Sequence, residues 1–150
     1  MTSNVATVTA AATPTPTPTP PGPADAAAAA KAIRSSAKHV AKVVEVTEDN
    51  DPNKLIGRSN GYVSAAVLYD SRTACSDGLG ADCGAMVEQW GSPADAKQRS
   101  EYIQKILKAS PVLGSEYDTV QGSFLLRVAG DLKPSQAKTY ASLFEEQFQN

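Results

Sequence analysis

The sequence predicts an α+β fold: a two-layer sandwich of a mostly antiparallel five-stranded sheet with helices mainly on one face. Two observations support this prediction. Segments with strand-like and helix-like apolar spacing follow one another in the order α-β-β-β-α-β-β-α, and neighbouring strands form hairpin-like pairs. Apolar residues make up 41% of the 150-residue chain and charged residues 20%, a balance typical of one globular domain.

The first helix is expected over residues 25–40, which are rich in alanine, the best helix former. Its apolar stripe is thin, so we expect this helix to be peripheral to the core. The stripe recurs at helical spacing and consists of Ala26, Ala30, Ile33, Ala37 and Val40. Residues 43–47 (VVEVT) then predict the first strand.

Strands two and three are expected over residues 62–70 and 85–90, as a hairpin pair with a long connection. Strand two is apolar on both faces, although a two-layer sandwich covers only one face of its sheet. We expect the second row to be covered by the first helix, by the connection after the strand, or by a partner. The rows are Val63, Ala65, Val67 and Tyr69 on one face and Tyr62, Ala66 and Leu68 on the other.

The clearest helix begins after Ser92, a favourable N-cap that is followed by Pro93 at the first helical position. Asp95 lies three residues after Ser92 and completes an approximate capping box. Pro111 ends the helix, because its ring cannot continue one. The stripe expected to face the core is Ala96, Arg99, Ile103, Ile106 and Leu107.

The C-terminal part of the domain predicts two strands and a last helix. The strands are expected over residues 116–120 and 123–129, joined near Gln121 and Gly122. Pro134 opens the last helix. Its apolar stripe is Ala137, Tyr140, Ala141, Phe144 and Phe148.

The chain divides into an uncharged leader, residues 1–23, and one foldable domain, residues 24–150. No charged residue precedes Asp25, and six of the ten prolines fall in the run TPTPTPTPPGP, residues 13–23. Proline at alternate positions favours the extended polyproline II conformation, in which this run would reach about 35 Å. We expect the leader to be a disordered spacer that holds the domain away from a surface.

Cys75 and Cys83 flank a short loop that is rich in glycine and aspartate. We expect them to form a disulfide, which indicates an oxidising compartment and an extracytoplasmic protein, secreted or surface-anchored. A zinc site is the weaker interpretation, because His39 is the only histidine and zinc takes four ligands. Residues 1–12 lack the basic start and apolar core of a signal peptide. We therefore expect a chain that has lost its export signal.

Charge and hydropathy exclude some classes of partner. The formal net charge of −2 gives no overall attraction to nucleic acid or to an anionic membrane. No apolar run approaches the roughly 20 residues of a transmembrane helix. We expect no cofactor and no catalytic set of residues.

The most distinctive segment, EDNDPNKLIGRSNGYVS, follows the first expected strand. Asp49, Asp51 and Asn53 alternate like the first three ligands of an EF-hand calcium loop. The pattern then fails, since Lys54 stands where the loop needs glycine and Asn60 where it needs a bidentate glutamate. We therefore expect no metal in this loop.

The same segment is typical of turn structure. Aspartate and asparagine side chains bond to nearby backbone groups, and Pro52 and Gly57 favour turns. We expect the Arg58 guanidinium to tie the loop together through Asp49 or Asp51. A binding surface on this loop is compatible with that role. Its candidate residues are Asp49, Asp51, Arg58, Asn60 and Tyr62.

In this segment the chain resembles a family of small exported or lipid-anchored proteins of high-GC Gram-positive bacteria. The shared pattern DPN-x-L-x-GR-x-x-x-Y is matched by Asp51, Pro52, Asn53, Leu55, Gly57, Arg58 and Tyr62. Two further blocks match, at residues 95–106 and 125–137, so the resemblance covers roughly residues 43–148. It implies export and no particular activity. The family's signal peptide or lipobox cysteine is not found in this chain, so the resemblance leaves anchoring open.

Three classes of function fit these observations. The leading hypothesis is a non-enzymatic binding module of the cell envelope or a secreted one, whose partner is a protein or another envelope component. The first alternative is a secreted inhibitor whose rigid loop or open sheet face blocks an extracellular enzyme. The second is a hydrolase that uses Asp49, Asp51 or His39.

Overall fold

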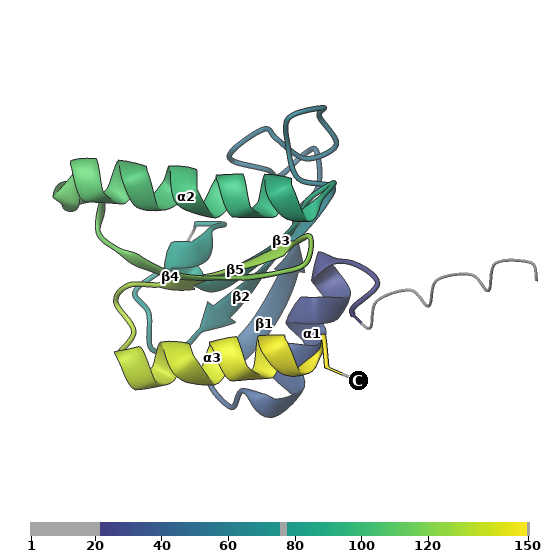
Figure 1. The fold of residues 1–150 in the computed structure, drawn as a ribbon. Coiled ribbons are helices and arrows are strands. Elements are labelled where there is room, and N and C mark those ends of the chain that lie inside the picture. Colours follow the sequence, from purple (N-terminus) through teal and green to yellow (C-terminus); the bar gives the residue numbers. More distant parts are fainter. Residues whose placement is uncertain (1–21, 76–77, 150) are drawn as a thin grey trace, which may run out of the picture.

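The computed structural model describes residues 22–75 and 78–149, which form one five-stranded antiparallel sheet and three helices (Figure 1). The α+β class and the antiparallel sheet are as predicted. The elements are α1 (Ala26–Ser36), β1 (Val40–Glu45), β2 (Ser64–Asp70), β3 (Gly84–Gln89), α2 (Pro93–Ala109), β4 (Glu116–Gln121), β5 (Phe124–Ala129) and α3 (Pro134–Glu146). Two short 3-10 turns, η1 (Ala81–Cys83) and η2 (Pro111–Leu113), complete them. The expected spacer lies outside the described residues, except for Gly22 and Pro23.

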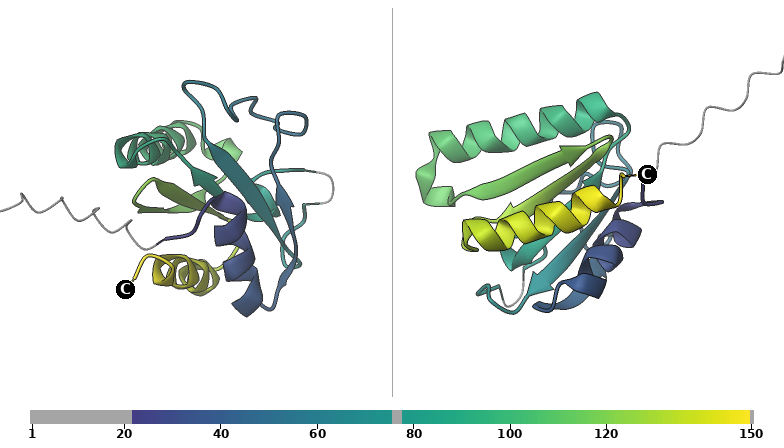
Figure 2. Two further views of the ribbon diagram at one scale, coloured as in Figure 1. Left: turned by 90° about the vertical axis from the view of Figure 1, so that its right-hand side faces the viewer. Right: turned by 60° about the horizontal axis from the view of Figure 1, so that its bottom comes forward.

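The strands lie in the order β1-β2-β3-β5-β4. The β4–β5 hairpin therefore pairs with β3 through β5, and β4 is the outer strand. Two helices, α1 and α3, cover one face of this sheet, and α2 covers the other face (Figure 2). The position of α2 follows from the strand order. It joins β3 to β4, which are not neighbours, and it crosses β5 to do so.

The first helix is central rather than peripheral. Its buried side chains pack against β1, β2 and β3, and they are Ala26, Ala27, Ala29, Ala30 and Ile33. A stripe of alanines is thin in volume, but it lets a helix approach a sheet closely and fill the space without larger side chains. The helix also ends earlier than expected, at Ser36, so that Val40 begins β1.

Both faces of β2 are covered by the chain itself. Ala66 and Leu68 pack in the cluster beneath α1 and α3, and Ala65 and Val67 pack in the cluster on the α2 face. Because β2 starts only at Ser64, the two residues before it leave the expected alternation. Tyr62 is buried on the α2 face, whereas Val63 is 57% exposed.

A buried carboxylate joins the end of β2 to α3. Asp70 accepts hydrogen bonds from the Tyr140 hydroxyl at 2.6 Å and from Nε and Nη2 of Arg72 at 2.9 and 2.7 Å. Burial by itself would raise the pKa of Asp70, but the bonds from Arg72 and Tyr140 outweigh it and lower this pKa. Burial raises the pKa of Tyr140, and its hydrogen bond to Asp70 raises it further.

The expected disulfide is present between Cys75 and Cys83, whose Cα atoms lie 4.7 Å apart. Cys83 is buried in the cluster on the α2 face. The Thr73 hydroxyl donates to the Cys83 carbonyl at 2.8 Å, which adds a second link between the two ends of the β2–β3 connection. Within the described part of the chain, no helix has the length and apolar character needed to cross a membrane.

Replacing both cysteines by alanine is expected to lower the free energy of unfolding by about 2 kcal/mol, since the cross-link no longer restricts the unfolded chain. Urea melts of the double variant and of the oxidised wild type measure this difference. Equal midpoints would contradict a stabilising disulfide.

A second carboxylate, Asp118 on β4, lies in the interface between the sheet and α2. Its Oδ2 accepts from Gln104 Nε2 at 3.0 Å and from Ser100 Oγ at 3.4 Å, while its buried Oδ1 has no hydrogen-bond partner among the described residues. Burial raises the pKa of Asp118 to about 6, assisted by the nearby charge of Glu116. The ionised form of Asp118 is therefore the unfavourable one in the folded state.

Asp118→Asn is expected to stabilise the protein at pH 7 by on the order of 1–2 kcal/mol. The folded state holds the Asp118 proton up to about pH 6, whereas the unfolded chain releases it near pH 4. The contribution of Asp118 is therefore full below about pH 4 and is lost as the pH rises to about 6. Urea melts of both proteins at pH 4 and pH 7 should show the advantage of the variant at pH 7 only. If the variant were more stable than the wild type by the same amount at pH 4, the ionisation of Asp118 could not be the cause.

Candidate functional site

The connection between β1 and β2, residues 46–63, is organised by the carboxylate of Asp51. Oδ2 of Asp51 accepts from the backbone N–H groups of Leu55 and Ile56 at 2.8 and 2.9 Å. Oδ1 accepts from the N–H of Asn53 at 2.9 Å and from the Tyr62 hydroxyl at 2.5 Å. One side chain, 6% exposed, thus holds the two ends of the turn together. We call residues 46–63 the Asp51 loop.

The charge of Asp51 is stabilised by this set of donors. Burial alone would raise the pKa of Asp51, but the Tyr62 hydroxyl and the three N–H groups together lower it below its ordinary value. Burial and the bond to Asp51 raise the pKa of Tyr62, so its hydroxyl keeps its proton and remains a donor.

Backbone packing keeps the Asp51 loop tight. The N–H of Gly57 donates to the Tyr62 carbonyl at 3.0 Å, and Gly57 has a φ of 74°, a conformation that favours glycine. At Gly61 the backbone passes so close to the Leu55 carbonyl that a Cβ atom would collide with it. The loop is therefore preformed rather than adaptable.

Another buried carboxylate, that of Glu88 on β3, lies beneath α2. Its Oε1 accepts from Trp90 Nε1 at 3.1 Å and from Arg99 Nε at 3.3 Å. Its Oε2 accepts from Arg127 Nη1 at 2.9 Å, and Arg127 also forms a two-pronged ion pair with Glu116. Glu88 thereby fixes Trp90 and Arg99 relative to the sheet.

Trp90 connects the two carboxylate-centred regions. Its ring lies edge-on to that of Tyr62, with centroids 5.8 Å apart, and the Arg99 guanidinium carbon lies 5.9 Å from the Trp90 ring centre. The hydroxyl of Tyr62 is held by Asp51, whereas the indole N–H of Trp90 is held by Glu88. The position of the Asp51 loop is thus coupled to that of α2.

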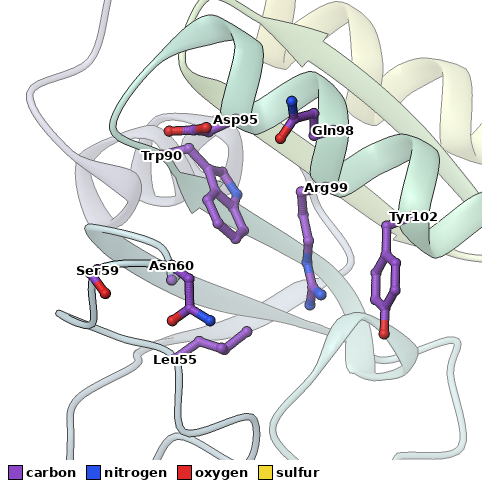
Figure 3. Close-up of a pocket in the computed structure, with 9 residues that line it drawn as sticks. Leu55, Ser59, Asn60, Trp90, Asp95, Gln98, Arg99 and Tyr102 are labelled. Carbon is purple, nitrogen blue, oxygen red and sulfur yellow. The ribbon is translucent and has the colours of Figure 1, made fainter.

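Between these two elements lies a groove with a volume of about 540 Å³ (Figure 3). We call it the α2 groove. Side chains of Trp90, Arg99 and Tyr102 point into it from the sheet and α2, and Leu55 and Asn60 lie on the loop side. Ser59, Gly61, Asp95 and Gln98 complete the lining. Tyr102 is 58% exposed, so its ring is available to a ligand.

The structure separates the residues that the sequence proposed for binding. Asn60 lines the α2 groove, whereas Asp49, Asp51 and Arg58 line a different hollow of about 480 Å³. Tyr62 is fully buried and bound to Asp51, so it faces neither hollow.

The expected role of Arg58 in organising the loop was wrong. Its exposed side chain forms no hydrogen bond or ion pair with any described residue, and Asp51 takes the role through backbone donors instead. Backbone N–H groups within a few residues of Asp51 reach its carboxylate with little loss of conformational entropy. A long arginine side chain would lose more side-chain entropy to make the same contact.

Of the residues considered for metal binding or hydrolysis, Asp49 and Asp51 line one hollow and His39 lines another. Both oxygens of Asp51 already accept hydrogen bonds, so they do not form part of a calcium loop with Asp49. Among the described residues, the grouped potential metal ligands are Cys75, Asp82 and Cys83, and the two thiols are joined as a disulfide. His39 lines a third hollow, of about 390 Å³, that contains neither Asp49 nor Asp51.

Sequence patterns did not single out the groove residues Trp90 and Tyr102, and they placed Arg99 only on a core-facing helix stripe. The one signal available was that Trp90 is the only tryptophan of the chain. Searches against family models, curated proteins and solved structures each found nothing that matches this chain.

Asp51→Asn is expected to lower the free energy of unfolding at pH 7 by on the order of 3 kcal/mol, because an amide NH₂ then faces backbone donors inside the loop. Asp49→Asn and Arg58→Lys are the matched controls, since both side chains are exposed, and each should change stability by less than about 0.5 kcal/mol. Urea melts measure all three.

The difference between wild type and Asp51→Asn also depends on pH. Because the pKa of Asp51 is lowered in the folded state, its contribution is present above about pH 4 and is lost as the pH falls further. If Arg58→Lys lowered the free energy of unfolding more than Asp51→Asn does, the organisation of the loop by Asp51 would be contradicted.

Proposed function

We propose that this protein is a non-enzymatic binding module that works outside the cytoplasm and holds its ligand in the α2 groove. The observation that carries the proposal is the fixation of both groove walls by buried charge. Asp51 holds the loop wall and Glu88 holds Trp90 and Arg99 on the opposite side. A preformed site loses little conformational entropy when a ligand binds.

The lining of the groove suits a ligand that combines apolar surface with hydrogen-bonding groups. Tyr102 offers an exposed aromatic ring and Trp90, 9% exposed, a small part of its indole, while Asn60, Gln98 and Arg99 offer planar polar groups. A peptide or a glycan-peptide of the cell envelope has this mixture of groups. An envelope component is thus the partner that we propose.

The location outside the cytoplasm is supported by the disulfide. Such bonds persist in oxidising compartments and are rare in the reducing cytoplasm. The resemblance of the DPN-x-L-x-GR segment to exported proteins supports the same location.

The binding role is favoured over hydrolysis by the placement of the candidate catalytic groups. Paired acid and base groups must lie within reach of one bound substrate. Asp49 and Asp51 line one hollow, but both oxygens of Asp51 already accept hydrogen bonds, and His39 and the groove carboxylate Asp95 line two other hollows. The site therefore supports recognition better than it supports acid–base chemistry.

Trp90 provides a direct test, because it is the only tryptophan and lies in the groove. The fluorescence of the full chain is titrated with soluble disaccharide-peptide fragments of peptidoglycan and, separately, with an unstructured peptide of mixed sequence. Saturable quenching by one of the probes is expected. Tyr102→Ala should weaken that binding at least ten-fold while leaving the melting temperature unchanged, since the ring is largely exposed.

Lys138→Ala is the matched control, because Lys138 is an exposed residue on α3, on the opposite face of the sheet. It should bind like the wild type. No saturable response to either probe, or equal affinity of wild type and Tyr102→Ala, would contradict the proposal. Mass spectrometry of the recovered probe separates binding from hydrolysis, since a cleaved probe would favour the enzyme.

A further inference from the structure

The turn that follows α2 carries two exposed aliphatic side chains side by side in the sequence. Val112 is 93% exposed and Leu113 is 62% exposed, both in the 3-10 turn η2 (Pro111–Leu113), which has no buried residue. Ile106, in the last turns of α2, is also exposed. Single exposed apolar residues are ordinary, whereas a turn that projects proline, valine and leucine together is a candidate contact surface.

Two lysines flank this turn. Lys105 and Lys108 lie in the last two turns of α2, are exposed, and form no ion pair within the described parts of the chain. We call Ile106, Lys105, Lys108 and residues 111–113 the α2 tip. The net charge of −2 for the whole chain hides this local excess of positive charge.

Two acidic groups near the α2 tip are paired with basic side chains. Glu101 pairs with Lys97 at 3.9 Å, and Glu116 pairs with Arg127 at 2.7 Å. Asp82, which lines a hollow together with Leu113, and Asp131, which follows Gly130 beside Ser115, form no ion pair among the described residues. The positive charge of the tip itself comes from Lys105 and Lys108.

The described part of the chain leaves the side chains of Val112 and Leu113 largely exposed. In Figure 1 the green C-terminal end of α2, where the tip lies, is on the side of the molecule opposite to α1 and to the yellow end of α3. The apolar turn is thus accessible to a surface without obstruction by either end of the described chain.

We propose that the α2 tip binds the surface of an anionic lipid bilayer, with Val112 and Leu113 entering the headgroup boundary and Lys105 and Lys108 facing anionic headgroups. Apolar side chains next to lysines are the combination that interfacial membrane binding requires. A protein partner is less suited, because protein interfaces are depleted in lysine and use aromatic anchors in a larger, flatter surface. This inference is independent of the α2 groove.

The full chain is sedimented with large vesicles of phosphatidylcholine and phosphatidylglycerol in a 3:1 ratio, and in parallel with vesicles of phosphatidylcholine alone. Binding to the anionic vesicles is expected, at least ten-fold stronger than to the neutral ones and weakened by 0.5 M NaCl. The double variant Val112→Ser/Leu113→Ser should lose at least ten-fold in partitioning. Lys105→Glu/Lys108→Glu should remove the preference for anionic lipid.

Two control variants make the result specific. Val63→Ser removes an apolar side chain of similar exposure, 57%, that lies outside the tip, and Lys138→Glu changes the charge of α3. Both should partition like the wild type. Absence of binding to anionic vesicles would overturn the proposal. So would full binding by the Val112→Ser/Leu113→Ser variant with an unchanged melting temperature, since the attraction would then involve no insertion.

Discussion

The α2 face of the sheet depends on one buried carboxylate, that of Glu88. It lies on β3 with no exposed side-chain surface, where an unpaired charge would be strongly unfavourable. Three donors therefore have to converge on it, from Trp90 after the strand, Arg99 on α2 and Arg127 on β5. This requirement fixes the rotation of α2, orders the neighbouring hairpin and places the indole ring in the α2 groove.

The other two buried acids follow the same physical logic at different joints. Asp51 closes the Asp51 loop through backbone donors, and Asp70 joins β2 to α3 through Arg72 and Tyr140. In two of the three cases a tyrosine hydroxyl, held protonated by its surroundings, donates to the acid. Much of the small apolar core consists of alanine. The hydrogen bonds of the buried acids add contacts that are directional and therefore specify one arrangement of the elements.

The element types and their order were predictable from the sequence because they depend on local signals. Ser92 and Pro93 mark the start of α2, and alternation of apolar residues marks β5. The role of α1 was not predictable, since burial of an alanine stripe depends on what lies opposite. The groove was not predictable either, because Glu88, Trp90 and Arg99 are ordinary residues in a strand, after it and in a helix. Their roles arise only from the strand order, which no local pattern encodes.

The insertion of β5 between β3 and β4 has a consequence for how the chain reaches its native state. The β4–β5 hairpin is local in sequence, whereas the pairing of β3 with β5 joins residues about 40 positions apart, as Glu88 and Arg127 do. Chain closure over that distance is slow compared with hairpin formation. Glu88 leaves water when the hairpin docks onto β3 and α2 covers this face of the sheet, and its partners Arg127 and Arg99 arrive on these same two elements. The cost of dehydrating the acid and the ion pair that offsets it therefore occur in a single cooperative event, which leaves little room for a partly assembled sheet with an open edge.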